Sequence, residues 1–280
     1  MCRDCGCQEA SAERHAQLHH EHGHGHTHEH GHGHGHEHGH DHPHPHAVAV
    51  APRRIALELS VLARNNQLAA QNREWLERHQ IRALNLISAP GSGKTLLLER
   101  TAAQLRPSAQ LAILTGDQER DFDAQRLRRA GAEVRQINTH SACHLDAAMV
   151  KRELETFVRP GEHRLLIVEN VGNLVCPAAF DLGESEKVAL LSTTEGEDKP
   201  AKYPLLFREA SLILLTKIDL LPHLDFSVEL FTQHLRRVNP SAPLLMLSAR
   251  SGEGLQAWLE FLRTSDEKSL DLALPQVAGP

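Results

Sequence analysis

The chain has few of the features that would place it in a membrane, outside the cell or on nucleic acid. No run of about 18 apolar residues occurs in its 280 residues, so no membrane insertion is expected. The N-terminus lacks the basic-then-apolar pattern of a secretory signal. Five cysteines argue against a disulfide framework and favour reduced thiols in the cytoplasm. A formal net charge of −6 does not indicate a nucleic-acid partner.

The first 50 residues differ sharply in composition from the rest. They hold 16 of the 22 histidines and three of the five cysteines. Such a segment has almost no apolar surface to bury, so residues 1–50 are predicted to be a disordered, metal-binding Cys/His-rich tail. Imidazole suits nickel, copper and zinc alike, and metal buffering is the favoured interpretation. Every even position in the central tract is histidine, namely His22, His24, His26, His28, His30, His32, His34, His36, His38, His40, His42, His44 and His46.

Residues 54–270 are predicted to form one α/β domain, and prolines such as Pro52 close off the tail as a linker. Apolar runs alternate with amphipathic segments, which favours a mostly parallel sheet flanked by helices. The expected helices span 54–79, 94–105, 123–130, 145–158, 225–238 and 253–263. The expected strands span 84–88, 110–114, 133–137, 165–168, 188–192, 212–215 and 244–247, with a long loop after 165–168. Phosphates bind at the C-terminal ends of strands in such folds.

Residues 88–95, with the sequence SAPGSGKT, resemble a phosphate-binding loop and follow an apolar strand. A strand, a Gly-rich turn and a helix N-terminus aim several N–H groups at one anion. Lys94 can reach the β- and γ-phosphates, and the Thr95 hydroxyl can bind Mg²⁺. Ser88 replaces the usual first glycine. This motif predicts a P-loop NTPase whose phosphate-binding residues are Gly91, Ser92, Gly93, Lys94 and Thr95.

The base is predicted to be guanine, so that GTP and GDP are the nucleotides. Thr216, Lys217 and Asp219 lie in a T-K-x-D loop after an apolar strand, where GTPases carry N-K-x-D. A carboxylate accepts from guanine N1–H and N2–H₂, donors that adenine does not offer together. Threonine in place of asparagine is expected to weaken the bracing of this loop. A second base-contacting loop is expected at Ser248 and Ala249.

Two sets of candidate metal ligands are present. Cys2, Cys5 and Cys7 offer three thiolates, and removal of Met1 would add the free amine of Cys2. This S₃N set suits planar Ni(II) or tetrahedral Zn(II), and stray terminal cysteines are the alternative. The second set comprises Cys143, His144 and Cys176, all placed after strands at the phosphate-binding edge. Two thiolates and an imidazole leave room for a further ligand, although packing in the core is the alternative.

Taken together, these motifs resemble the HypB-type hydrogenase nickel-incorporation GTPases. The N-terminal C-x-x-C-G-C, the His-rich stretch and the phosphate-binding loop occur in that family's order. The likeness covers most of residues 80–265. Its longest stretches are 116–118 (GDQ), 138–146 (NTHSACHLD), 169–177 (ENVGNLVCP), 180–184 (FDLGE) and 194–200 (TEGEDKP).

The resemblance implies a domain that dimerises with GTP, hydrolyses it slowly and passes nickel toward the large-subunit precursor of a [NiFe]-hydrogenase. It also implies a HypA-type nickel/zinc accessory protein as partner. It favours a metal site at Cys143, His144 and Cys176. Asp117 matches a Mg²⁺-linked switch aspartate, and Glu169 stands where other GTPases carry D-x-x-G, so both join Lys94 and Thr95 as candidate catalytic residues. The resemblance suggests no catalytic base.

Three other functions remain open from the residues. The first is a nickel storage protein whose nucleotide domain acts only as an oligomerisation switch, and the histidine tract favours some storage. The second is a urease-type nickel-delivery GTPase, against which the N-terminal cysteines and the Cys143-His144 pair argue. The third is an ATP-dependent kinase, which Asp219 disfavours.

Overall fold

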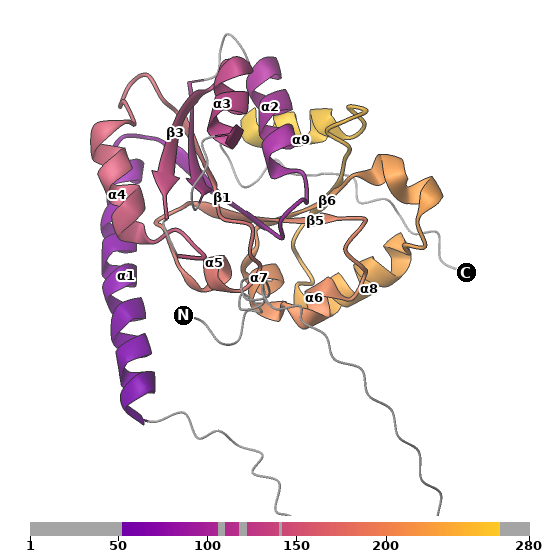
Figure 1. Cartoon of the computed structure of the whole chain (residues 1–280), viewed down its shortest axis with the longest axis horizontal. Coiled ribbons are helices and arrows are strands. Elements are labelled where there is room, and N and C mark those ends of the chain that lie inside the picture. The colour runs from indigo at the N-terminus through magenta and orange to yellow at the C-terminus, as the bar shows by residue number, and fades with distance from the viewer. Residues whose placement is uncertain (1–51, 106–109, 118–121, 140–141, 264–280) are drawn as a thin grey trace, which may run out of the picture. The chain divides into compact units, whose positions relative to one another are not determined.

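The computed structural model describes residues 52–105, 110–117, 122–139 and 142–263 (Figure 1). The chain divides into two units, residues 1–55 and 56–280. The predicted tail of residues 1–50, with Cys2, Cys5, Cys7 and the histidine tract, lies outside the described residues. Its predicted disorder and metal binding therefore stay predictions. In the described part, no helix combines the length and the hydropathy that crossing a membrane requires.

The described chain alternates strands and helices, which confirms the predicted α/β class. The strands are β1 Arg82–Ser88, β2 Leu111–Asp117, β3 Glu133–Asn138, β4 Leu165–Glu169, β5 Glu186–Ser192, β6 Leu212–Thr216 and β7 Leu244–Met246. The helices are α1 Pro52–Arg78, α2 Lys94–Gln104, α3 Phe122–Arg129, α4 Ala147–Thr156, α5 Cys176–Ala179, α6 Lys199–Lys202, α7 Pro204–Glu209, α8 Val228–Val238 and α9 Leu255–Arg263, and η1 Ile218–His223 is a 3₁₀ helix.

All seven strands pair in parallel in the order β3-β2-β4-β1-β5-β6-β7. Strand β1 is central, and β4 on one side and β5 on the other are its neighbours. The register pairs Leu86 of β1 with Glu169 of β4, and Thr115 of β2 with the same Glu169. Three strand ends that carry predicted nucleotide residues therefore lie side by side at one edge of the sheet.

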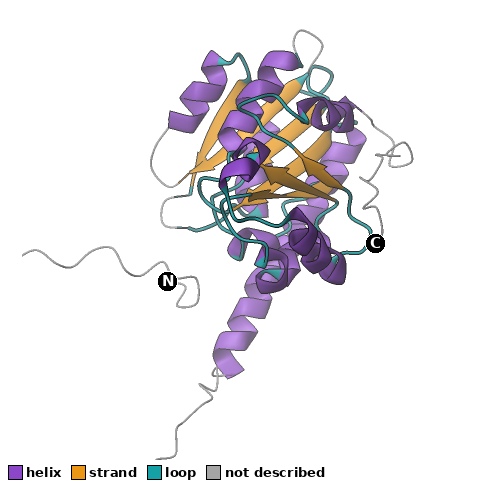
Figure 2. Cartoon of the chain, turned by 90° about the vertical axis from the view of Figure 1, so that its right-hand side faces the viewer, coloured by secondary structure: helices purple, strands orange, loops and turns teal. Residues whose placement is uncertain are grey.

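Helices cover both faces of the sheet, as Figure 2 shows. Helices α2, α3 and α9 pack on one face, against strand residues such as Leu84 and Leu86. Helices α1 and α4 pack on the other face beside β1, β2 and β4, against residues such as Ala83. Helices α5, α7 and α8 also cover that second face, farther along the sheet. Strand residues alternate between the two faces because a strand has a side-chain period of two.

Three segments differ from the sequence prediction. The loop expected after residues 165–168 contains the short helix α5, which begins at Cys176. Helices α6 and α7 occupy the interval between β5 and β6, where no helix was expected. Each begins with a proline in its first turn, a position that tolerates the missing N–H. For the same reason Pro52 is the first residue of α1 and not part of a linker.

Candidate functional site

The phosphate-binding loop connects the central strand β1 to helix α2. Gly91 and Gly93 adopt positive φ angles of 74° and 98°, which side chains rarely allow, so the loop needs glycine at both positions. Gly93 caps α2 without any side-chain hydrogen bond. The N–H groups of the first turn of α2 are therefore not capped by that residue and face the loop, as an anion site requires.

A cavity of about 530 Å³ opens beside this loop. It is lined by residues 90–96, by Thr115 and Gly116 at the end of β2, by Asp123 and Arg126 of α3, and by residues 169–172 after β4. The predicted phosphate residues Gly91, Ser92, Gly93, Lys94 and Thr95 all line it.

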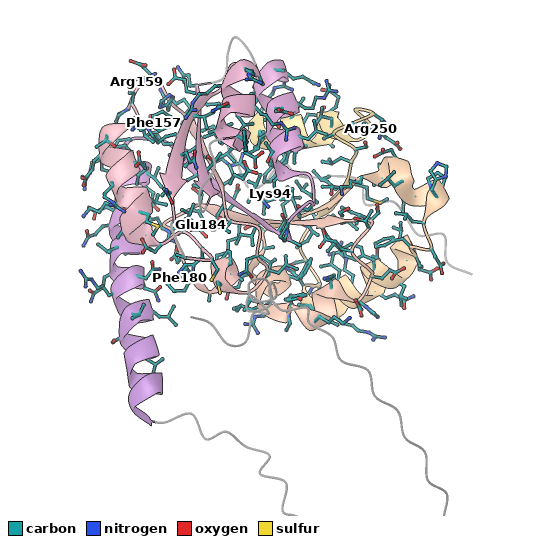
Figure 3. All side chains as sticks on the ribbon, viewed as in Figure 1. Lys94, Phe157, Arg159, Phe180, Glu184 and Arg250 are labelled. Carbon is teal, nitrogen blue, oxygen red and sulfur yellow. The ribbon has the colours of Figure 1, made fainter. Side chains whose placement is uncertain are left out.

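Lys94 is buried at the base of the cavity, and its ammonium donates to Ser88 Oγ at 2.7 Å (Figure 3). Burial lowers the pKa of Lys94, and the neighbouring Glu169 acts in the opposite direction. Ser88 Oγ also contacts Ser92 Oγ and donates to the carbonyl of Ala89. The serine that replaces the usual glycine thus supplies a hydroxyl that holds the lysine within the loop.

Glu169 is the last residue of β4 and accepts a hydrogen bond from Thr95 Oγ1 at 2.8 Å. Burial raises its pKa to about 7, against the effect of Lys94 and of the Thr95 hydrogen bond. Its second oxygen, Oε2, and Thr115 Oγ1 are buried without a hydrogen-bond partner among the described residues. Buried oxygens of this kind are normally satisfied. Carboxylate and hydroxyl oxygens are the hard donors that Mg²⁺ prefers, so Glu169, Thr95 and Thr115, which all line this cavity, fit that ion.

A second cavity, of about 270 Å³, adjoins the first and shares Ser92, Gly93 and Leu96 with it. Its other walls come from the loops after β6 and β7, which contribute the predicted base-contacting residues Lys217, Asp219, Ser248 and Ala249. Lys217 has a left-handed backbone, and Asp219 lies in the first turn of η1. The chain therefore places a carboxylate in a cavity next to the phosphate loop.

Thr216 joins the base loop to the phosphate loop through its side-chain hydroxyl. Its hydroxyl donates to the carbonyl of Ser92 at 2.6 Å and also lies 3.3 Å from the carbonyl of Leu191. Because Thr216 is buried at the end of β6, its short side chain reaches the phosphate loop directly. The expectation that threonine braces this loop less well than the usual asparagine stays a prediction.

The three cysteine and histidine residues predicted as the second metal set come together. One ligand atom from each of Cys143, His144 and Cys176 lies within 4.8 Å of the others, and all three side chains are half-buried. Burial lowers the pKa of His144, with Asp146 opposing, so the imidazole is neutral near pH 7 and can bind a metal. The His144 ring packs on Phe180 with 3.8 Å between ring centroids.

Comparison with known proteins identifies the family. A model of the CobW/HypB/UreG nucleotide-binding domain matches residues 83–246. The hydrogenase maturation factor HypB of Azotobacter vinelandii is 53% identical over 210 residues, covering 75% of this chain and 69% of that protein. The HypB of Escherichia coli K12 is 49% identical over 212 residues, covering 76% and 73%. The chain belongs to the HypB family of hydrogenase maturation factors.

A solved HypB structure shares the fold. The crystal structure of HypB from Helicobacter pylori in complex with nickel has a TM-score of 0.67 and 35% identity, covering 71% of this chain and 93% of that chain. The structure of HypB from Archaeoglobus fulgidus gives the same TM-score at 40% identity, covering 72% and 98%. The family resemblance expected from the motifs is therefore confirmed, and so is the P-loop fold.

One predicted residue of this site is only partly described by the structure, and one residue of the site was missed from sequence. Asp117 ends β2 as its position in the motif suggests, but its side chain lies outside the described part of the chain. Asn170 was quoted only as part of a motif, yet it is buried and bonded to two loops of the site. Its partners, Leu145 and Asn85, are 25 and 85 residues away in sequence, so no local signal could have found it.

Proposed function

We propose that this HypB-family chain is a GTP-hydrolysing nickel metallochaperone that helps insert nickel into the large subunit of a [NiFe]-hydrogenase. One observation carries the proposal: a P-loop cavity and a set of two thiols and an imidazole are built from loops at the same edge of one sheet. Cys176 lies four residues after Gly172, which lines the cavity. A GTPase alone would not need the thiols and the imidazole, and a metal-binding protein alone would not need the phosphate-binding loop.

Lys94 is proposed to sit against the β- and γ-phosphates, where its ammonium offsets their charge. Thr95 and Glu169 are proposed to hold Mg²⁺, with Asp117 joining them from the end of β2. The buried, unpartnered Oε2 of Glu169 supports this assignment. When bound, Mg²⁺ would stabilise negative charge on the phosphates during attack of water on the γ-phosphorus, with GDP as the leaving group.

Slow hydrolysis fits the rest of the cavity. Arg126 lines it, but its guanidinium pairs with the carboxylate of Glu99 at 3.0 and 2.9 Å. That arginine is thus held toward α2, and it is the one arginine among the described residues that line the cavity. We infer that the described residues aim no arginine at the phosphates, a contribution worth several orders of magnitude in related reactions.

Guanine is proposed as the base, with Asp219 accepting from its ring. Lys217 would cover one ring face, and the loop of Ser248 and Ala249 would contact the other edge. The Ser248 hydroxyl accepts the N–H groups of Arg250 and Ser251, which fixes this loop before any ligand binds. Adenine would leave the carboxylate unpaired, and this mismatch supports GTP over ATP.

Cys143, His144 and Cys176 are proposed to bind Ni²⁺ or Zn²⁺. Three protein ligands leave at least one coordination position open, and a second copy of the chain is proposed to approach this site when GTP drives dimerisation. The neutral state favoured for His144 supports metal binding, because a protonated imidazole cannot be a ligand.

The tail is proposed to store nickel for this site. Deleting residues 15–46 removes 16 imidazoles and leaves both cysteine sets. We expect a large fall in nickel bound per chain, nearly intact GTPase activity, and impaired hydrogenase maturation chiefly when nickel is scarce. Loss of maturation even with excess nickel would show that the tract does more than buffer.

The partners proposed are a HypA-type nickel/zinc accessory protein and the hydrogenase large-subunit precursor, with all steps in the cytoplasm. The deciding experiment measures hydrogenase activity in a strain lacking this gene, with and without added nickel. We expect loss of activity that nickel partly restores, and full rescue by the parent chain but not by Cys176→Ala. Unchanged hydrogenase activity together with lost urease activity would favour urease-type delivery instead.

A further inference from the structure

Leu145 lies between the candidate metal ligands and the end of a nucleotide-binding strand. It directly follows His144 and is fully buried. Its side chain packs so closely on Gly116 that a Cβ added there would lie 2.8 Å from Leu145 Cγ. Gly116 lines the phosphate cavity and precedes Asp117. Hence the metal loop, residues 142–146, packs on β2 at Gly116, the residue before the candidate Mg²⁺ ligand Asp117.

Asn170 connects the same leucine to the loop after β4. Its amide oxygen accepts the N–H of Leu145 at 3.2 Å and the N–H of Val171 at 2.9 Å. The next residue, Gly172, packs on the phosphate loop, where an added Cβ would lie 3.0 Å from atoms of Pro90. One oxygen therefore bonds both the metal loop and the segment that lines the phosphate cavity.

A buried chain of side chains fixes the orientation of the Asn170 amide. Its nitrogen donates to Asn85 Oδ1 at 3.1 Å, and Asn85 donates in turn to Glu184 Oε1 at 3.2 Å. Glu184 accepts the N–H of Leu182 on its other oxygen, Oε2, at 2.6 Å. All three side chains are buried. Rotating the Asn170 amide would leave several buried groups unpaired at once, a cost of about 1–3 kcal/mol each.

Helix α1 holds the far end of the metal loop in place. Asn72 donates to the carbonyls of Ala147 and Leu182, each at 2.9 Å. Asn65 accepts the N–H of Ala147 and donates to the carbonyl of Asp181. The metal loop is thus anchored to α1 at Ala147, the residue that follows it. Leu145 is the residue of the loop that contacts Gly116 and Asn170 on the nucleotide side. Figure 3 shows Glu184 and Phe180 on this side of the molecule, away from Arg250 at the base loop.

We propose that Asn170 is a positioning residue that passes the nucleotide state to the metal loop through Leu145. When the γ-phosphate orders the Val171–Gly172 segment, the shared oxygen of Asn170 shifts with it. The Leu145 N–H follows, and with it the adjacent His144 ligand. The inference rests on the proposed nucleotide and metal functions, which supply the two ligands. It adds the residue through which they are coupled.

The test measures metal affinity at this site in two nucleotide states. The full chain carries Cys2→Ser, Cys5→Ser and Cys7→Ser, so that thiolate-to-Co²⁺ charge-transfer absorption reports only Cys143 and Cys176. Co²⁺ is titrated with GDP and with a non-hydrolysable GTP analogue. We expect this parent to show affinities about fivefold or more apart, the lower end of typical coupling. In Asn170→Ala, the ratio of the Co²⁺ affinities in the two nucleotide states is expected to fall below about twofold while the absorption band persists.

Two further variants separate positioning from folding. Asn239 is a matched control because it is also a buried asparagine, and its amide donates to the carbonyls of Phe207, Arg208 and Ala210 and not to the metal loop. Asn239→Ala should lower stability and keep the parent ratio. Asn170→Asp keeps an oxygen for both N–H groups but loses the nitrogen that donates to Asn85 Oδ1, so it should restore part of the ratio that Asn170→Ala loses.

The outcomes distinguish the inference from the proposed function. A parent without a thiolate band would refute the proposed metal site, and the inference with it. Equal Co²⁺ affinities in the two nucleotide states would leave the metal site in place but refute its coupling to the nucleotide, and the inference with it. A parent ratio that persists in Asn170→Ala would overturn the inference alone. If Asn170→Ala does not fold, hydrogen exchange at the Leu145 amide of the parent decides. Protection that differs between the two nucleotide states supports the link, and equal protection overturns it.

Discussion

The loops that form the nucleotide cavities and the loop that carries the metal ligands are built in opposite ways. In the first, polar side chains are buried and bonded to one another: Ser88 and Ser92 hold Lys94 in place, and Thr216 braces the phosphate loop from β6. In the second, the three ligands are half-buried. The His144 ring packs on Phe180, and its Nδ1 lies 3.7 Å from Cys143 Sγ.

This difference matches the two ligands. A phosphate site gains from donors fixed before binding, since no reorganisation is then needed as charge develops. A site that must release its metal gains from accessible ligands and an incomplete ligand set. Among the described residues, the buried contacts of Leu145 with Gly116 and Asn170 join the fixed region to the loop that carries Cys143 and His144.

The largest effect is expected at the centre of the fixed region. Lys94→Ala removes the ammonium nearest the phosphates, and removal of one preorganised electrostatic group typically costs about 10²–10³-fold in turnover. Steady-state phosphate release is the measurement. Lys151→Ala is the control, because Lys151 lies on the surface and bonds to Gln71. A Lys94 variant that turns over at the parent rate would mean that the ammonium is not at the phosphates.

A smaller loss is expected at the base cavity. Asp219→Asn replaces a doubly accepting carboxylate by an amide, and a hydrogen bond to a charged group contributes about 1.5–3 kcal/mol, or roughly ten- to 150-fold in affinity for GTP. Calorimetry with GTP and ATP measures it, and Asp225→Asn at an exposed position nearby is the control. Equal affinities of the parent for the two nucleotides would refute the guanine assignment.

The next effect is a pH dependence of nucleotide binding that arises from Glu169 in the fixed region. The pKa of Glu169, raised by burial to about 7, lies above its ordinary value near 4.5. The protonated carboxyl therefore stabilises the free protein at low pH, and this contribution is lost as the pH rises through about 7. Mg²⁺ needs the carboxylate, so affinity for Mg²⁺–GTP should rise by up to about tenfold per pH unit toward pH 7 and then level off.

Calorimetry at pH 5.5 to 8 in the parent and in Glu169→Gln tests this pH profile. The glutamine variant cannot titrate at this position and should bind more weakly with a nearly flat profile. Measurements without Mg²⁺ should also flatten the profile. Equal slopes in the parent and the variant would assign the titration to another group.

The smallest effect is expected where one neutral hydrogen bond joins the base loop to the phosphate loop. Thr216→Val removes the hydroxyl bonded to the Ser92 carbonyl, a loss of about 1 kcal/mol or roughly fivefold in nucleotide affinity. Thr232→Val is matched, since its hydroxyl bonds only within α8. If the two variants bind GTP alike, Thr216 does not brace the nucleotide site.

The fold and the nucleotide residues were predictable because their signals are local. The strand before Ser88, the glycines after it and the helix from Lys94 form one continuous pattern, and the T-K-x-D loop lies within four residues. The helix α5 at Cys176 and the prolines that open α6 and α7 gave weaker signals, since each helix has only four to six residues.

What sequence could not provide is the buried polar chain between the two regions. Asn85, Asn170 and Glu184 are far apart in sequence, and an asparagine in a strand or loop gives no periodic signal. Their contacts depend on the strand order β2-β4-β1, which apolar patterns alone do not determine. The same holds for Thr216, whose bracing role appears only once β6 is placed beside the phosphate loop.

The most direct test of the account is reciprocity between the two sites. The affinity for a non-hydrolysable GTP analogue, relative to that for GDP, is measured without Co²⁺ and with enough Co²⁺ to saturate the thiolate band of Cys143 and Cys176. The chain again carries serine at positions 2, 5 and 7. The account predicts that metal changes this nucleotide ratio by the same factor by which nucleotide changes metal affinity, about fivefold or more. A nucleotide ratio unaffected by bound metal would contradict it.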